Sequence, residues 1–174
     1  QRNGTYALKN LPTIMGMEAS GKIKKLGKVA EVIINELSKI EKGYNIHYEL
    51  HNAKDFGIPQ DRERIIIGGV RNDLDYIFKF PKPTKKTVKF GDILDKEVDA
   101  KYTISDKLWA GHQRRKKEHK KKGNGFGYSI FDETSGYTST ISARYYKDGS
   151  EILIKQEGKN PRKLTPREAA RLQG

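Results

Sequence analysis

Positive charge is concentrated in one stretch of the sequence. Residues 112–122 read HQRRKKEHKKK, with seven Lys or Arg and one acid, and the Gly-rich segment GNGFGY follows at residues 123–128. Lys and Arg can bind phosphates, while a Gly-rich loop lets the backbone come close to a polyanion. A charge run of this kind also occurs on a solvated helix face or in a disordered tail.

A second group of chemically capable side chains lies at Gln60-Asp61-Arg62-Glu63-Arg64. A guanidinium offers several donors in a fixed fork, so an arginine can hold a base edge and a phosphate together. Taken alone, Arg62 and Glu63 are more typical of ordinary charges at the edge of a strand.

The overall composition favours a polyanionic partner. Lys and Arg number 35 against 22 Asp and Glu among 174 residues, which gives a formal charge of +13. Such an excess most often indicates nucleic acid. The chain has no cysteine, so it cannot supply a disulfide, a Cys-ligated zinc site or a cysteine nucleophile.

Membrane and metal sites are not expected. No apolar run approaches the roughly 18 residues of a transmembrane helix, and the basic run lacks the apolar face of an interfacial helix. Gln1 to Gly4 lack the apolar block of a signal peptide. His112 and His119 lie seven residues apart in the basic run, without the further ligands that a metal site needs.

Residues 26–67 predict a helix and two strands, which form an α/β fragment. Apolar residues recur at spacings of three and four over residues 26–42, which predicts a helix followed by Gly43 at its C-terminal end. Residues 44–50 alternate apolar and polar side chains, which predicts a half-buried strand. Ile65-Ile66-Ile67 predicts a strand buried on both faces.

The composition changes after Leu74, where prolines and lysines indicate a linker or a new lobe. Beyond it the sequence predicts only short elements: strands at 88–90, 138–143 and 152–154, and a short helix at 105–109. The clearest local pattern is a helix start in which Thr165 is the N-cap, Pro166 the first helical residue and Glu168 the N3 acid of a capping box.

Three stretches together resemble the C-terminal half of a bacterial restriction–modification DNA cytosine-5 methyltransferase. Asn52 to Arg64 resembles the family's Gln-x-Arg-x-Arg motif. Tyr137 to Ile154 resembles the end of its target-recognition domain, with a Thr-Ile pair at Thr140. Arg162 to Gly174 resembles the motif IX helix. The order and spacing match, with a variable lobe of about 90 residues between the first and third stretches.

The resemblance implies an α/β fold, in which the C-terminal part of a Rossmann-like methyltransferase domain carries a small, irregular, β-rich target-recognition lobe. Residues 1–74 would end the catalytic domain, residues 75–160 would form the target-recognition domain, and residues 161–174 would be the helix that joins the two lobes.

The resemblance also implies roles for the arginine motif. The target cytosine leaves the DNA stack before it reacts, because its C5 and C6 atoms cannot be attacked inside the duplex. Arg64 would bind the carbonyl oxygen of the flipped cytosine, and Arg62 would neutralise the flanking backbone and catalytic loop. Gln60 would fill space or pair near the orphan base. Thr140 would bind the phosphate beside the flipped base.

DNA readout would come from two loops and the basic run. Arginine can read guanine bidentately, and tyrosine can stack or contact phosphate. The expected DNA-binding residues besides Thr140 are Arg144, Tyr145, Tyr146, Asn124, Arg114, Arg115 and Lys116. The segments 123–127 and 142–149 resemble those of enzymes that read CC/GG-type palindromes. Arg162, Arg167 and Arg171 are expected to be structural.

The catalytic half of the family has no counterpart in this sequence. A cysteine nucleophile and a Gly-rich S-adenosylmethionine loop are absent, and Tyr6-Ala7-Leu8 occupies the place of the family's Glu-Asn-Val. We therefore expect the isolated chain to be inactive, and its cofactor to be bound by a complementary catalytic half. That half would be a further segment of a longer protein or the other subunit of a split enzyme. The expected partner is double-stranded DNA, and the expected location is the bacterial cytoplasm, in association with the nucleoid.

Two other functions remain open from the sequence. A standalone basic DNA-binding module or regulator would use the same charges without catalysis. A ribosomal or RNA-binding protein fits the charge but not the three motifs.

Overall fold

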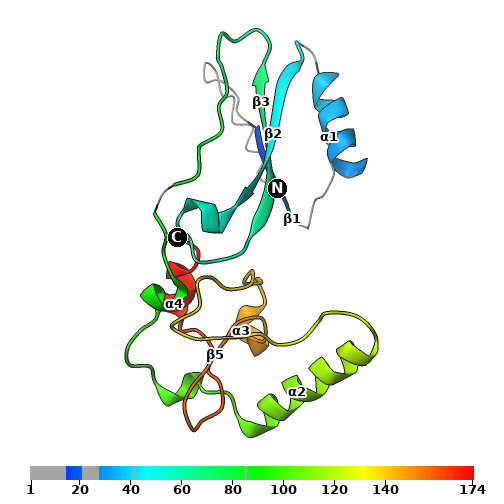
Figure 1. The fold of residues 1–174 in the computed structure, drawn as a ribbon. Coiled ribbons are helices and arrows are strands. Elements are labelled where there is room, and N and C mark those ends of the chain that lie inside the picture. The colour runs from blue at the N-terminus through cyan, green and yellow to red at the C-terminus, as the bar shows by residue number, and fades with distance from the viewer. Residues whose placement is uncertain (1–14, 21–27, 41, 85) are drawn as a thin grey trace, which may run out of the picture. The chain divides into compact units, whose positions relative to one another are not determined.

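The structure is a computed structural model, and it describes residues 15–20, 28–40, 42–84 and 86–174 (Figure 1). The Leu8–Leu11 stretch, which resembles the sequence after the family's Glu-Asn-Val motif, lies outside the described residues.

The chain divides into two compact units. The first comprises residues 1–51 and 63–82, and the second comprises residues 52–62 and 83–174. This division differs from the boundaries expected after residues 74 and 160. Residues 52–62, which precede strand β3, group with the second unit, and so does the C-terminal helix.

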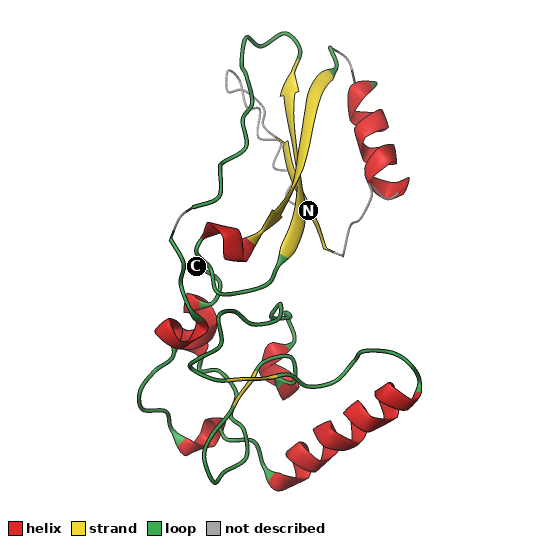
Figure 2. Ribbon diagram, viewed as in Figure 1, coloured by secondary structure: helices red, strands yellow, loops and turns green. Residues whose placement is uncertain are grey.

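The described residues of the first unit form a three-stranded sheet in the order β1-β3-β2 and the helix α1 (Figure 2). Strand β1 (Met15–Ser20) pairs antiparallel with β3 (Glu63–Arg71). Strand β2 (Tyr44–Asn52) confirms the strand predicted from the alternating pattern and extends it by two residues. Helix α1 (Lys28–Ser38) confirms the predicted helix but ends before Gly43. None of the helices in the described part of the chain is long and apolar enough to cross a bilayer.

The core of the first unit lies along β3. Ile65, Ile67 and Val70 are buried, whereas Ile66, which the apolar run also predicted to be buried, is half-buried. Gly68 allows close packing, because a Cβ there would lie 2.7 Å from the ring of Phe78. Phe78 belongs to the extended chain that follows β3. This packing explains why a glycine interrupts an otherwise β-branched strand.

The second unit has little regular structure. Its longest element is α2 (Asp106–Lys121), where Ser105 accepts a hydrogen bond from the Leu108 N–H as the N-cap. The others are short: 3₁₀ turns at Ala53–Phe56, Phe90–Ile93 and Ala100–Tyr102, strands β4 (Ile130–Phe131) and β5 (Leu153–Ile154), and helices α3 (Tyr145–Asp148) and α4 (Pro166–Arg171). Strands β4 and β5 pair in parallel.

Two predicted strands of the second unit were wrong, and one predicted helix was too short. The expected strand at 88–90 is a turn that begins at Phe90, because the Asp92 side chain accepts a hydrogen bond from the Lys89 N–H and closes the backbone. The expected strand at 138–143 makes one isolated bridge at Thr138 and then turns into α3. The helix expected at 105–109 continues through the basic run to Lys121.

The core of the second unit combines residues from across its length. Phe90, Tyr145, Ile152, Ile154, Leu164 and Leu172 are among its buried members. Helix α4 has the predicted capping box, in which Thr165 and Glu168 bond each other's backbone N–H groups. The capping box fixes where α4 begins, and Leu172 at its C-terminal end is fully buried in this core.

Candidate nucleic-acid interface

The segment Pro59–Arg62, called the motif segment below, is hydrogen bonded to the loop Thr138–Arg144, called the recognition loop. The Thr138 N–H donates to the Pro59 carbonyl over 3.0 Å, and the Asp61 N–H donates to the Thr138 carbonyl over 2.8 Å. The Thr140 hydroxyl donates to the Asp61 carbonyl over 2.8 Å. Two stretches separated by some 80 residues in the sequence are thus held in one register.

Gln60 lies at the centre of this connection and is 1% exposed. Its Nε2 donates to the Leu172 carbonyl over 2.9 Å, and its Oε1 accepts from the Ile141 N–H over 3.1 Å. The expected pairing of Gln60 near an orphan base does not agree with this geometry, because both ends of the amide are bonded inside the protein.

Arg62 and Arg64 belong to different units. The Arg62 N–H donates to Asn52 Oδ1 over 3.0 Å, and its Nη1 donates to Gln173 Oε1 over 3.3 Å. Arg64 lies on β3, where its Nη1 donates to the Glu63 carbonyl over 2.7 Å. Both side chains are half-buried. Each arginine thus has a hydrogen bond within its own unit.

Thr140 is half-buried, and its single hydroxyl proton is directed at the Asp61 carbonyl. A phosphate oxygen is an acceptor, so a Thr140–phosphate bond would require this proton to move from Asp61. To make the expected phosphate contact, Thr140 would have to give up its hydrogen bond to the Asp61 carbonyl.

The three residues expected to read DNA after Thr140 have different surroundings. Arg144 is exposed, and Tyr146 is 73% exposed. Tyr145, in contrast, is buried: its hydroxyl donates to the Ile152 carbonyl over 2.6 Å and accepts from the Leu164 N–H over 2.8 Å. Burial raises the pKa of this hydroxyl above its ordinary value. The DNA contact expected of Tyr145 is corrected to a core role.

Helix α2 has a packed face and an exposed face. His112 is 1% exposed, and its Nδ1 accepts a hydrogen bond from Arg115 Nη2 over 2.6 Å. Burial first, and then the charge of Arg115, lower the pKa of His112. Lys116 donates to the Tyr128 carbonyl over 2.9 Å, and its ammonium lies 4.2 Å from the centre of the Tyr128 ring.

Arg115 and Lys116, which were expected to bind DNA, are exposed, and each also has a contact within the second unit. Arg115 also pairs with Asp148 at 3.6 Å. Asn124, a third expected DNA contact, is half-buried, and its Oδ1 lies 2.7 Å from His119 Nδ1.

Four exposed cations lie on the side of α2 that faces away from His112. These residues recur at spacings of three and four, so they share one side of the helix. They are Arg114, Lys117, Lys120 and Lys121. Within the described part of the chain, the Lys117, Lys120 and Lys121 ammonium groups have no hydrogen bond or ion pair, and Arg114 has a 3.8 Å pair with Glu118. Only Arg114 of these four was among the predicted DNA-binding residues, although helical spacing indicates the other three as well.

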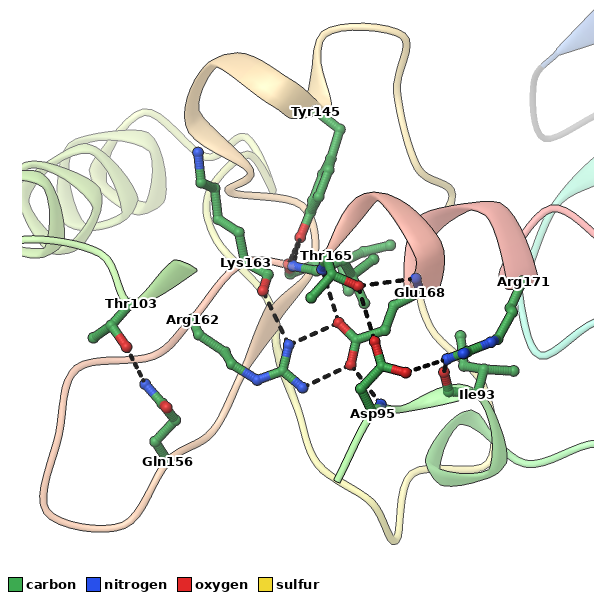
Figure 3. Close-up of polar contacts among 12 residues, drawn as sticks. Ile93, Asp95, Thr103, Tyr145, Gln156, Arg162, Lys163, Thr165, Glu168 and Arg171 are labelled. Carbon is green, nitrogen blue, oxygen red and sulfur yellow. Dashed lines mark hydrogen bonds and ion pairs between the residues drawn. The ribbon is translucent and has the colours of Figure 1, made fainter. Parts of the chain in front are cut away.

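The C-terminal helix is fixed by a buried ion pair (Figure 3). Arg162 Nη1 and Nη2 each donate to a different oxygen of Glu168 over 2.8 Å. Glu168 is 0% exposed and also accepts from the backbone N–H groups of Asp95 and Thr165, over 2.9 and 2.8 Å. Arg171 donates to Asp95 Oδ1 over 2.6 Å, and this bond is the main reason why the pKa of Asp95 is lowered. The expected structural roles of Arg162 and Arg171 agree with these contacts.

Comparison with known proteins gives this two-unit α/β chain a class. It belongs to the C-5 cytosine-specific DNA methylase family, whose model matches residues 6–174. It is 56% identical over 153 residues to the type II methyltransferase M1.ScrFI of Lactococcus lactis subsp. cremoris, which covers 85% of this chain and 38% of that protein. It is 52% identical over 174 residues to M.SsoII of Shigella sonnei, with 97% and 43% covered. The chain thus spans less than half the length of these relatives.

Solved methyltransferase structures share the fold. The Entamoeba histolytica methyltransferase EhMeth matches with a TM-score of 0.67 and 21% identity, over 97% of this chain and 52% of that one. The S. pombe Dnmt2 methyltransferase matches with a TM-score of 0.67 and 18% identity, over 95% and 55%. These likenesses confirm the α/β class of the fold.

A methyltransferase family implies S-adenosylmethionine as the methyl donor. Such cofactors are held by a Gly-rich turn between a strand and a helix. The Gly-rich segment 123–127 instead follows helix α2 and leads to the short strand β4. No cofactor-binding residue is assigned in the described part of the chain. Within the described ranges, no group of three or more His, Cys, Asp or Glu could hold a metal ion.

Proposed function

We propose that this chain is the DNA-recognising portion of a type II DNA cytosine-5 methyltransferase, and that a separate catalytic portion supplies the cysteine nucleophile and binds S-adenosylmethionine. The main support is the family match over residues 6–174, combined with 52–56% identity to type II methyltransferases over most of the chain. In this proposal, residues 1–74 complete a Rossmann-like catalytic domain.

The proposed chemistry uses Arg64 and Arg62 on a cytosine that has left the DNA stack. Arg64 would donate to the carbonyl oxygen of the flipped base, and Arg62 to the adjacent backbone phosphate. A guanidinium carries five N–H donors, so bonds to Glu63 and Gln173 are compatible with further bonds to DNA. S-adenosylmethionine, when bound by the catalytic portion, supplies the methyl group for C5.

The proposed DNA-binding surface combines the exposed face of α2 with the end of the recognition loop. Arg114, Lys117, Lys120 and Lys121 would neutralise phosphates, which gives affinity without sequence preference. Arg144 and Tyr146 are exposed and would provide base readout and stacking. This surface supports double-stranded DNA as the partner.

Assembly with a catalytic portion tests the proposal. The purified chain should neither bind S-adenosylmethionine nor transfer methyl groups, and mixing it with the complementary portion should start C5 methylation of DNA. Bisulfite sequencing of a methylated random-site library would then identify the recognition site. Methyl transfer by the chain alone, or no transfer by any assembled mixture, would contradict the proposal. The second outcome, together with tight DNA binding, would favour a standalone regulator.

The two arginine roles can be separated in the assembled enzyme. Arg64→Ala removes a charge-assisted bond worth roughly 1.5–3 kcal/mol, so single-turnover methylation should fall about ten- to hundredfold with site preference unchanged. Arg144→Ala should relax discrimination at one base pair by roughly 1–3 kcal/mol and leave base flipping intact. Arg64→Lys should rescue poorly, because an ammonium cannot reproduce the fork. The opposite pattern would show that the two roles are assigned wrongly.

A further inference from the structure

The bonds between the motif segment and the recognition loop come from both backbone and side chains. The backbone bonds at Pro59, Asp61 and Thr138 set the register, and the Gln60 amide then extends the contact to Ile141. Gln60 also bonds the C-terminal end of α4 through the Leu172 carbonyl. One side chain therefore joins three segments that lie far apart in the sequence.

The chemistry of this position is demanding. The side chain must present one acceptor to the Ile141 N–H and one donor to the Leu172 carbonyl, at the end of a two-carbon stem. The neutral amide of glutamine meets both needs. The ionised carboxylate of glutamate has no donor, and the thioether of methionine can form neither bond well. Gln60 is 1% exposed and Leu172 is 0% exposed, so water has little access to replace a lost bond.

We propose that Gln60 is a positioning residue for DNA readout: it fixes the recognition loop, with Arg144 at its C-terminal end, relative to the segment that carries Arg62. The inference depends on the proposed function, because it concerns how accurately the loop presents Arg144 to a base. Its physical basis is that a bidentate contact discriminates between bases only when the donor is held in place. Gln60 is not expected to contact the DNA.

The first test replaces Gln60 by methionine in the complete methyltransferase, with Gln156→Met as the matched control. Gln156 is also a bridging amide of the second unit, and its Nε2 donates to Thr103 Oγ1 over 3.0 Å and to the Asn160 carbonyl over 2.6 Å. The measured quantity is the ratio of single-turnover rates on cognate and single-mismatch duplexes. Gln60→Met should lower this ratio about tenfold, as expected for impairing one bidentate contact. Gln156→Met should leave the ratio unchanged.

A second variant keeps the shape of the side chain. In Gln60→Glu, the protonated acid can donate to the Leu172 carbonyl and accept from the Ile141 N–H, as the amide does. Burial favours this neutral form by raising the pKa of the carboxyl group. Discrimination by Gln60→Glu should therefore improve toward the wild-type ratio as the pH is lowered, whereas Gln60→Met should show no such recovery. If Gln60→Met does not fold, the pH dependence of discrimination by Gln60→Glu still tests the proposal.

Hydrogen exchange of residues 138–141 in the same proteins separates this inference from the proposed function. Loss of the Gln60 bond should speed exchange of the Ile141 amide roughly fivefold or more in Gln60→Met, but not in Gln156→Met. If the wild type does not methylate DNA but exchange responds in this way, the proposed function fails while the structural link stands. Unchanged discrimination in Gln60→Met, an equal change in Gln156→Met, or no pH recovery in Gln60→Glu would overturn the positioning role.

Discussion

The second unit places its charged side chains in two contrasting environments. Arg162 and Glu168 are 9% and 0% exposed in their side chains, and they bond each other through two 2.8 Å contacts. On the exposed face of α2, Lys117, Lys120 and Lys121 point away from the packed side that carries His112. Both regions are rich in charge, but the Arg162 and Glu168 charges are paired inside the protein, whereas these three lysine ammonium groups have no partner among the described residues.

The difference shows which charges are available to a polyanion. A buried guanidinium paired with a carboxylate contributes to one specific packing, and breaking that pair is costly. Exposed lysines contribute little to stability but can release counterions from DNA. Net charge alone does not separate these two uses, whereas burial and pairing do.

Removing the buried carboxylate should have the largest effect. Glu168→Ala leaves Arg162 buried without its anion, and it also leaves the Asp95 and Thr165 N–H groups without their acceptor. The free energy of unfolding should fall by about 3–5 kcal/mol. Urea denaturation would measure the change, with Glu118→Ala on the exposed side of α2 as a control expected to cost less than about 1 kcal/mol. A loss below about 1 kcal/mol for Glu168→Ala would remove the contrast between the two regions.

Tyr145 and Tyr146 repeat this contrast within two adjacent residues. Tyr145→Phe leaves the Ile152 carbonyl and the Leu164 N–H without a partner in the core, so unfolding should become easier by about 1–3 kcal/mol. Tyr146→Phe, at a 73% exposed position, should change stability by less than about 0.5 kcal/mol. Thermal and urea unfolding would test both. Equal effects of the two substitutions would contradict the core assignment of Tyr145.

Features encoded locally could be predicted from the sequence. The capping box of Thr165 and Glu168 involves residues three apart, and its partners are fixed by the first turn of α4. Helix α1 and strand β3 were predicted for a similar reason, because their apolar patterns match the local period of each structure. The DNA contact expected of Thr140 stays a prediction.

Features that depend on tertiary contacts could not be predicted. The strand expected at 138–143 is irregular because its partners are Pro59, Gln60 and Asp61, about 80 residues away. In the sequence, Arg115 and Lys116 are equivalent to Lys117, because all three belong to one run of cations. They differ only in the fold, where Arg115 pairs with Asp148 and Lys116 bonds the 123–128 loop. Tyr145 and Tyr146 were likewise indistinguishable until the core was known.

The exposed lysines should change DNA binding without changing stability. Each of Lys117→Ala, Lys120→Ala and Lys121→Ala should reduce the slope of log K against log salt by about 0.9 if the side chain contacts one phosphate. Unfolding free energies should stay within about 0.5 kcal/mol of the wild type. Fluorescence titration of duplex DNA over a salt series would measure the slope. Lys101→Ala, which removes a lysine paired with Asp99, is the control. An unchanged slope in all three variants would exclude this face of α2 from the interface.

The pH dependence of stability that is due to Asp95 should be the smallest effect. The exposure of Asp95 is intermediate between that of the buried Arg162–Glu168 pair and that of the exposed lysines. Asp95 is partly exposed but bonds Arg171, which lowers the pKa of Asp95 in the folded protein. A carboxylate with a lowered pKa stabilises the fold at neutral pH, and this contribution is lost as the pH falls below about 4 toward the folded value. Asp95→Asn should therefore be less stable than the wild type at pH 7, with the gap narrowing at acidic pH. Urea unfolding from pH 7 to pH 3 would measure it, with Arg171→Met as the matched control that also removes the pair. A gap that stays constant over this range would show that the Asp95–Arg171 bond contributes no charge-dependent stability.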